Sequence, residues 1–323
     1  MFGSGDHEHW CGHCSRRHKS SIRVETHINQ GPALDVVSSL ILGSKAAVLV
    51  DVPLTIPQAR ELIEWVKKTS QVPLVAIFAT HFHPDHYMSA SVVLQAFPTA
   101  KFYANSKAVA LIKNEAQKRA DFWRSVLPAD SIVETPAIPT PYDYSFFSLP
   151  CDGPIFLISS LNGDTPDETM FWVPNTRTLI AGDVVYGHKM HMWLADLDEP
   201  SLTTAWLESL DLISSLGAQV IIPGHALIND QFDATKDLEH TRAYLQFFRD
   251  EVESKGVDAL TPDDIAQKLT KAFPGLLEVS GSTTSKAMVQ INSQHFGKGG
   301  SRQPHFVDLA DYQKAIATKW SLA

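Results

Sequence analysis

Three imidazoles and one carboxylate stand within residues 80–86, which read Thr-His-Phe-His-Pro-Asp-His. The apolar run before them, residues 75–79, is typical of a buried strand, and a tight loop after a strand projects its side chains into one small volume. Imidazole nitrogen and carboxylate oxygen are ligands for zinc and equally for iron or manganese. These residues therefore predict a metal site rather than a polar surface loop that is rich in histidine.

Further residues of the same types follow other predicted strands. Asp183 comes after a strand expected over residues 178–181, and His225 comes after one expected over residues 219–222. Taken singly, Asp183 is also typical of a turn cap and His225 of a hydrogen-bonded core histidine. Their recurrence at strand ends, together with the first motif, favours one shared site.

The elements that must position these side chains follow the order strands, helices, strands, helices. We expect strands over residues 22–26, 36–42, 46–51, 72–79, 101–104, 155–160, 170–173 and 178–181. Helices are expected from residue 55 and over residues 89–97, 106–126 and 202–216. Beyond residue 230 the apolar spacing is helical, with a further helix expected over residues 309–320. We therefore predict a polar arm over residues 1–20, a catalytic domain over 21–230 and a helical extension over 231–323. This extension either covers the domain or forms a contact between subunits of a homo-oligomer.

Composition limits the class of protein. The chain has 323 residues, 44% hydrophobic and 20% charged, with a net charge of −9, which argues against a nucleic-acid surface because such a surface needs a basic face. No apolar run approaches the roughly 18 residues of a membrane span, and the first residues lack the core of a signal peptide. The cysteines, Cys11, Cys14 and Cys151, are odd in number and predict no disulfide framework. A cytoplasmic location, with no membrane partner, is the expectation.

The motif His-x-His-x-Asp-His after a strand, followed by Gly182-Asp183 and by Pro223-Gly224-His225, resembles the metallo-β-lactamase superfamily of metal-dependent hydrolases. The resemblance covers about residues 21–230. It implies an α/β fold in four αββα layers, here with a helical C-terminal extension. It also implies two divalent ions, zinc before manganese or iron. The ligands that it implies for the two ions are His81, His83, Asp85, His86, Asp183 and His225.

In this assignment, His81 and His83 bind the first ion, and Asp183 bridges both. Where the superfamily usually places another histidine, in a segment like Gly-His-Thr-Pro, this chain has Gly163-Asp164-Thr165-Pro166. Either Asp164 coordinates the first ion as a carboxylate, which favours harder ions, or that ion is weakly held or absent. We favour coordination.

Three residues are candidates for proton transfer. Asp85 is a candidate proton shuttle, and His191 or Tyr186 is a candidate donor to the developing oxyanion or to the leaving group, with a role in shaping the pocket as the alternative for His191. Four further side chains predict a largely apolar pocket: Phe82, Met88, Met192 and Trp193. Asp167 and Glu168 are typical of a solvated turn.

The resulting hypothesis is a metallo-hydrolase that uses a metal-bound hydroxide to open a lactam, lactone, ester or thioester bond of a small, largely apolar molecule. Two alternatives remain open. One is an iron-dependent oxidoreductase on the same fold, similar to sulfur dioxygenases, and the other is a non-enzymatic descendant of the superfamily.

Overall fold

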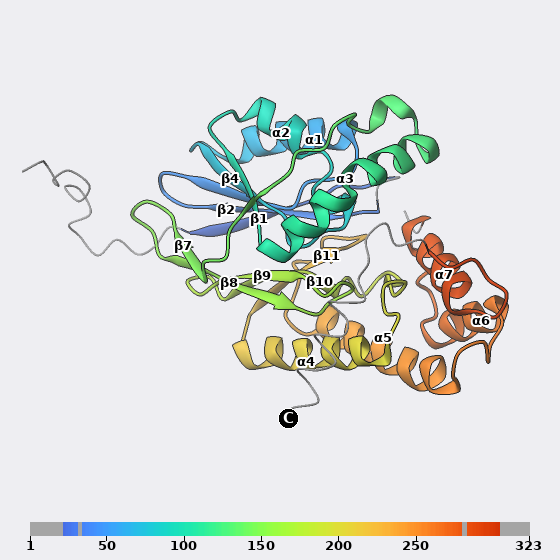
Figure 1. Cartoon of the computed structure of the whole chain (residues 1–323). Coiled ribbons are helices and arrows are strands. Elements are labelled where there is room, and N and C mark those ends of the chain that lie inside the picture. The colour runs from blue at the N-terminus through green and yellow to red at the C-terminus, as the bar shows by residue number, and fades with distance from the viewer. Residues whose placement is uncertain (1–21, 32–33, 280–282, 304–323) are drawn as a thin grey trace, which may run out of the picture.

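The computed structural model describes residues 22–31, 34–279 and 283–303 (Figure 1). Within them the strands form two sheets, and the order of strands in the first sheet follows the chain, β1-β2-β3-β4-β5-β6. The bounds of these strands are β1 Arg23–Ile28, β2 Val37–Leu42, β3 Ala47–Val50, β4 Leu74–Phe78, β5 Lys101–Ala104 and β6 Thr140–Pro141. The second sheet has the order β11-β10-β9-β8-β7. Its strands are β7 Phe146–Ser148, β8 Pro154–Leu161, β9 Glu168–Val173, β10 Thr178–Tyr186 and β11 Val220–His225.

Helices cover the outer face of each sheet, which gives four layers (Figure 1). On the first sheet lie α1 Ile56–Thr69, α2 Ala90–Ala96 and α3 Ser106–Val126, and on the second lie α4 Pro200–Leu216 and α5 Lys236–Glu251. The αββα fold expected from the sequence is confirmed. Strands β3, β4 and β5 are parallel, as are β10 and β11, so the C-terminal ends of each set lie at one edge of the sheet.

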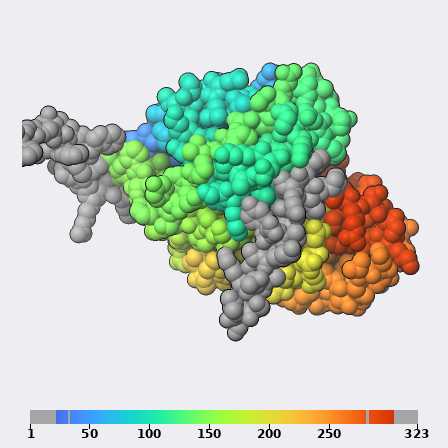
Figure 2. Space-filling view, viewed as in Figure 1, coloured from blue at the N-terminus to red at the C-terminus, as the bar shows by residue number. Residues whose placement is uncertain are grey.

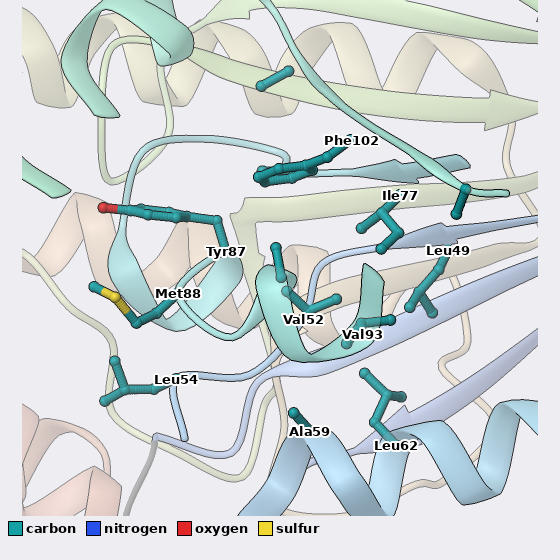
Figure 3. Close-up of a cluster of buried hydrophobic side chains, with 14 of the residues drawn as sticks. Leu49, Val52, Leu54, Ala59, Leu62, Ile77, Tyr87, Met88, Val93 and Phe102 are labelled. Atoms are coloured by element: carbon teal, nitrogen blue, oxygen red, sulfur yellow. The ribbon is translucent and has the colours of Figure 1, made fainter. Parts of the chain in front are cut away.

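Three apolar clusters hold the layers together. The inner cluster lies between the sheets, where alternate side chains such as Ile41, Val48, Phe78, Phe171 and Ile222 interdigitate. A second cluster joins the first sheet to α1, α2 and α3 (Figure 3). The third joins the second sheet to α4 and α5. Because both faces of β2 and β10 are covered, every residue of these two strands is buried.

The predicted C-terminal extension begins with α5, which covers the second sheet, and within the described residues two helices follow it, α6 Pro262–Ala272 and α7 Thr283–Phe296. They form a lobe at one side of the sandwich, coloured orange and red in Figure 2. α6 begins with a capping box, in which Thr261 and Asp264 satisfy each other's backbone N–H groups. The lobe belongs to the third cluster through Ile265, Leu269 and Met288, so part of the extension covers the sandwich.

The cysteine count predicted no disulfide framework, and the structure shows that Cys151 is nevertheless disulfide-bonded. An odd number of cysteines still allows one pair, and the N-terminal cysteines lie outside the described residues. The arm over residues 1–20 and the helix expected over residues 309–320 also lie outside them. Among the helices that the structure describes, none is long and apolar enough to cross a membrane.

Candidate metal centre

Four separate segments bring the predicted ligands to one end of the sandwich. The loop after β4 carries the three histidines and Asp85, and the segment before β9 carries Asp164. Asp183 lies within β10, and His225 ends β11. Gly224 allows this approach: a Cβ there would lie 2.7 Å from the backbone carbonyl carbon of Gly182 and would also meet the carboxylate of Asp183. β11 thus keeps a glycine where the ligand carboxylate needs space.

The seven predicted ligands form two groups of buried side chains, within each of which the ligand atoms lie no more than 4.8 Å apart. The first group is His81, His83, Asp164 and Asp183, and the second is Asp85, His86 and His225. Asp183 also connects the groups, since its Oδ1 lies 3.3 Å from His86 Nε2 and its Oδ2 lies 3.1 Å from His225 Nε2. The structure therefore brings together every residue for which metal binding was predicted.

The donor atoms fit divalent cations. His81 Nε2, Asp164 Oδ1 and Asp183 Oδ1 are buried and have no hydrogen-bond partner among the described residues. Asp164 Oδ2 lies 3.1 Å from His83 Nδ1, so the carboxylate that replaces the expected histidine does reach the first group. Buried polar atoms that lack a partner imply a missing ligand, and a cation satisfies nitrogen and carboxylate oxygen together.

The four histidines are oriented by hydrogen bonds on their outer nitrogens. In each ring one nitrogen contacts an oxygen of the surrounding protein, and the other nitrogen faces the ligand groups. The outer contacts are His81 Nδ1 to Thr80 Oγ1 (2.9 Å), His83 Nε2 to Asp196 Oδ2 (3.1 Å), His86 Nδ1 to Asp51 Oδ2 (2.9 Å) and His225 Nδ1 to Leu34 O (2.6 Å). An outer acceptor fixes the proton on the outer nitrogen, which leaves the inner lone pair free to bind a metal.

Comparison with known proteins agrees with this geometry. The family model of the metallo-beta-lactamase superfamily matches residues 31–225, which is more than half of the chain. This protein belongs to the metallo-beta-lactamase superfamily.

The individual relatives share little sequence identity with this chain. The chain is 26% identical over 207 residues to metallo-beta-lactamase IND-1 of Chryseobacterium indologenes, covering 63% of this chain and 75% of that protein. It is 21% identical over 267 residues to a linear primary-alkylsulfatase of Pseudomonas sp. (strain ATCC 19151), covering 71% of this chain. It spans only 49% of the length of that alkylsulfatase. A solved beta-lactamase domain protein from Burkholderia ambifaria superposes with a TM-score of 0.57 at 16% identity, over 84% of this chain and 86% of that one, and this likeness concerns the fold alone.

In this superfamily member, Asp51 is a site residue that sequence reasoning missed. It follows β3 directly, and Val50 pairs in parallel with Phe78, so Asp51 lies beside the start of the ligand loop. Its Oδ1 accepts from the backbone N–H of Thr80 at 2.8 Å, and its Oδ2 accepts from Thr80 Oγ1 and His86 Nδ1, each at 2.9 Å. The sequence signal that could have pointed to Asp51 is its position as a polar residue directly after a predicted buried strand.

Two further acids contradict the prediction of a solvated turn, because Asp167 and Glu168 are completely buried. Glu168 begins β9 and places Oε1 3.2 Å from His81 Nδ1. Burial, with Asp164 and Asp183 nearby, raises the pKa of Glu168 well above its usual value. Burial also raises the pKa of Asp167 to about 7. Both acids therefore belong to the interior of the site rather than to its surface.

The ligand carboxylates differ in charge state. Burial raises the pKa of Asp164 to about 6. Burial acts in the same direction on Asp183, but the neighbouring His225 and His86 outweigh it and hold the pKa of Asp183 well below its usual value. Asp183 is thus ionised between the two groups, whereas a positive charge beside Asp164 would favour the ionised form of its carboxyl group.

The two candidate proton donors are in different places. The hydroxyl of Tyr186 lies 2.6 Å from Asp183 Oδ2 and 3.0 Å from Asp164 Oδ2, and its ring stacks on His225 at 5.4 Å. His191, in contrast, is buried against Tyr244 and Phe273 and is not among the residues that line the cavity. The structure does not support a direct role for His191 in proton transfer, and Tyr186 lies where it orients the two carboxylates.

A cavity of about 270 Å³ opens over the two groups. Trp193 lines it as predicted, but Phe82, Met88 and Met192 do not. Phe82 and Met88 are core residues against α1 and α2 (Met88 is labelled in Figure 3), and Met192 lies in the core of the second sheet. Apolar walls come instead from Leu34, Pro84, Phe122, Trp123, Val126, Met288 and Ile291. The pocket is largely apolar as expected, although three of the four residues predicted to line it do not.

Proposed function

We propose that this protein is a hydrolase that uses two divalent metal ions to open a lactam, lactone, ester or thioester bond of a small, largely apolar molecule. The observation that carries the proposal is the pair of ligand groups, joined by Asp183, at the base of an apolar cavity. Zinc is the proposed metal, with manganese or iron favoured by the carboxylate of Asp164 as alternatives.

The roles of the residues follow from their positions. His81, His83 and Asp164 would hold one ion, Asp85, His86 and His225 the other, and Asp183 both. When bound, such ions activate water and polarise the bond that is broken. The carboxylate of Asp85 borders both the cavity and the second group, with Oδ2 3.3 Å from His225 Nε2. Asp85 is therefore placed to accept a proton from the attacking water and to return it to the leaving group.

The relatives support hydrolysis but leave open which bond is broken, so an alkyl sulfate ester is a second candidate substrate. It is favoured by the apolar walls of the cavity, together with the similarity to a linear primary-alkylsulfatase. The iron-dependent oxidoreductase stays a prediction, and oxygen uptake with a persulfide substrate would distinguish it. The non-enzymatic alternative predicts less than about half a metal ion per chain, because an idle site has no need to retain metal.

The test is hydrolysis of a panel that contains a lactone, a lactam, a thioester and an alkyl sulfate. The protein is assayed as isolated, after removal of its metal by a chelator, and after addition of zinc, manganese or iron. We expect activity on at least one member of the panel, loss of that activity without metal, and recovery on addition of metal. Activity that survives complete removal of metal would refute the proposal, as would inactivity of the fully loaded protein on every substrate.

A further inference from the structure

The helix α7 of the C-terminal extension and the helix α3 of the sandwich both contribute apolar side chains to the cavity over the ligand groups. Phe122, Trp123 and Val126 come from the end of α3, and Met288 and Ile291 come from α7. Side chains of both ligand groups line the same cavity, so a molecule bound beside them also contacts side chains of these two helices. Apolar walls on both sides predict an apolar part of the substrate.

The position of α7 beside the cavity is specified by hydrogen bonds rather than by loose apolar contact. Ser285 Oγ accepts from the backbone N–H of His191 at 2.7 Å. Asn292 accepts from the backbone N–H of Leu194 at 3.0 Å and donates to the carbonyl of Met192 at 2.8 Å. Ser285 and Asn292 are completely buried, so these contacts fix the helix against the segment 191–194.

That segment is also tied to the ligands, because Trp193 lies within it. The indole N–H of Trp193 donates to Asp196 Oδ2, and the same oxygen contacts His83 Nε2 at 3.1 Å. The Trp193 ring lies edge to face with His83 at 6.1 Å. α7, Trp193 and His83 therefore form one continuous rigid arrangement from the extension to the first ligand group.

The charge at the cavity argues against recognition of a second charged group on the substrate. Among the described lining residues, Arg119 is the one lysine or arginine, and its Nε lies 3.1 Å from the buried carboxylate of Glu115. At the outer end of the cavity, Phe122 and Val126 are 38% and 57% exposed. Exposed apolar side chains at the mouth of a polar site are typical of a surface that binds an apolar group.

We propose that the cleft between α3 and α7 is a specificity site, which binds an elongated apolar acyl or alkyl group of the substrate and directs the adjoining reactive bond to the ligand groups. This inference rests on the proposed function and deepens it, since it assigns to the C-terminal extension the choice of substrate. The cleft lets apolar groups of increasing length gain contact as they extend along α3. Transfer of each further methylene group from water into this cleft gives roughly a fourfold gain in binding.

The first experiment measures kcat/KM for the metal-loaded protein with straight-chain acyl thioesters from acetyl to decanoyl, and with the matching alkyl sulfates. We expect kcat/KM to rise by roughly threefold to fourfold per methylene until the cleft is filled. The double variant F122A/I291A should reduce this to about twofold or less per methylene, because it removes one apolar side chain from each wall. Val257→Ala is the control, since Val257 is 81% exposed and does not line the cavity.

A second experiment measures binding without hydrolysis, with straight-chain methyl ketones as probes and calorimetry as the readout, in metal-loaded and metal-free protein. The same dependence on chain length and the same loss in the double variant are expected. If the ketones show this dependence but no substrate is hydrolysed, the proposed function fails and the specificity site stands. Hydrolysis that is independent of chain length, or equal in the double variant and the control, overturns the specificity site. Absence of any ketone binding also overturns it.

Discussion

Asp51 gives the sharpest test of how the second ligand group is oriented. In the structure its Oδ2 accepts the Nδ1–H of His86, so Nε2, which faces Asp183 and His225, is the nitrogen that a metal would bind. The substitution Asp51→Asn keeps the size of the side chain but replaces one acceptor oxygen with an NH₂ donor. We expect it to reverse the tautomer of His86.

Neither orientation of the asparagine amide restores the hydrogen bonds that Asp51 makes. If the asparagine oxygen keeps its hydrogen bond to the backbone N–H of Thr80, then its NH₂ group faces His86 Nδ1. The imidazole must then accept at Nδ1 and carry its proton on Nε2, where a metal could not bind. If the amide turns over, its NH₂ group faces the buried N–H of Thr80 instead, and an unpaired buried donor costs about 1–3 kcal/mol. Changes of this kind beside a metal ligand typically lower metal affinity by about 10- to 100-fold.

The assay is competition for zinc between the metal-free protein and a chromogenic chelator, which separates tighter from weaker ions. Asp143→Asn is a matched control, because Asp143 accepts from both the backbone N–H and the Oγ of Ser106 but contacts no histidine. Nitrogen NMR of the zinc-loaded protein reports directly which ring nitrogen of His86 carries the proton. Unchanged zinc affinity for the second ion in Asp51→Asn, with the proton still on Nδ1, would refute this reasoning.

Three further substitutions test the carboxylates. Tyr186→Phe removes the hydroxyl shared by Asp164 and Asp183 but keeps the stacked ring, so affinity for metal should fall by about tenfold, and unchanged affinity in chelator competition would contradict an orienting role. Asp164→His should raise affinity for zinc relative to manganese at the first group by roughly tenfold or more, measured by metal content after equilibration with both ions, and an unchanged ratio would show that Asp164 is not a ligand. Burial raises the pKa of Asp167 from its ordinary value of 3.8 to about 7, so the folded protein loses stability as pH rises between these values. Asp167→Asn should therefore raise the melting temperature of the metal-free protein at about pH 8 and much less at about pH 4, and an equal gain at both would contradict the shift.

Local patterns in the sequence predicted most strands and helices, because these follow apolar spacing. The αββα layers and the proposed ligand positions came from the resemblance to the superfamily. The loop with His81, His83 and His86 stands directly after a strand, whereas Asp164 precedes β9 and Asp183 lies within β10. Asp51 escaped prediction because its role depends on the parallel pairing of β3 with β4, which no local pattern reveals. The walls of the cavity escaped it for the same reason, since α3 and α7 are far apart in the chain and meet only in the fold.

Other errors came from applying a correct general rule in the wrong context. Consecutive acidic residues, such as Asp167 and Glu168, are usually exposed to solvent. Here β9 begins inside the site, so both side chains are buried. Phe82 was expected in the pocket as one of four apolar side chains near the ligands, and it lies between His81 and His83 in the chain. Neighbouring side chains in an extended segment point to opposite sides, so with His81 and His83 directed to the site, Phe82 is directed into the core.

The clustering of buried acids makes the two ligand groups suited to cations. Asp85, Asp164, Asp183 and Glu168 lie together in the interior, and the metal-free arrangement tolerates them by keeping protons on some and by charging neighbouring histidines. His83 shows this most clearly: burial lowers its pKa, but Asp164 and Asp196 outweigh burial and raise the pKa well above its usual value. A proton on His83 occupies the nitrogen that the first ion needs. Binding of that ion therefore displaces protons from His83 and Asp164 together, so acid and metal compete for the same atoms. Neighbouring carboxylates outweigh burial and raise the pKa of His86 and of His225 as well, so acid also opposes metal binding at the second group.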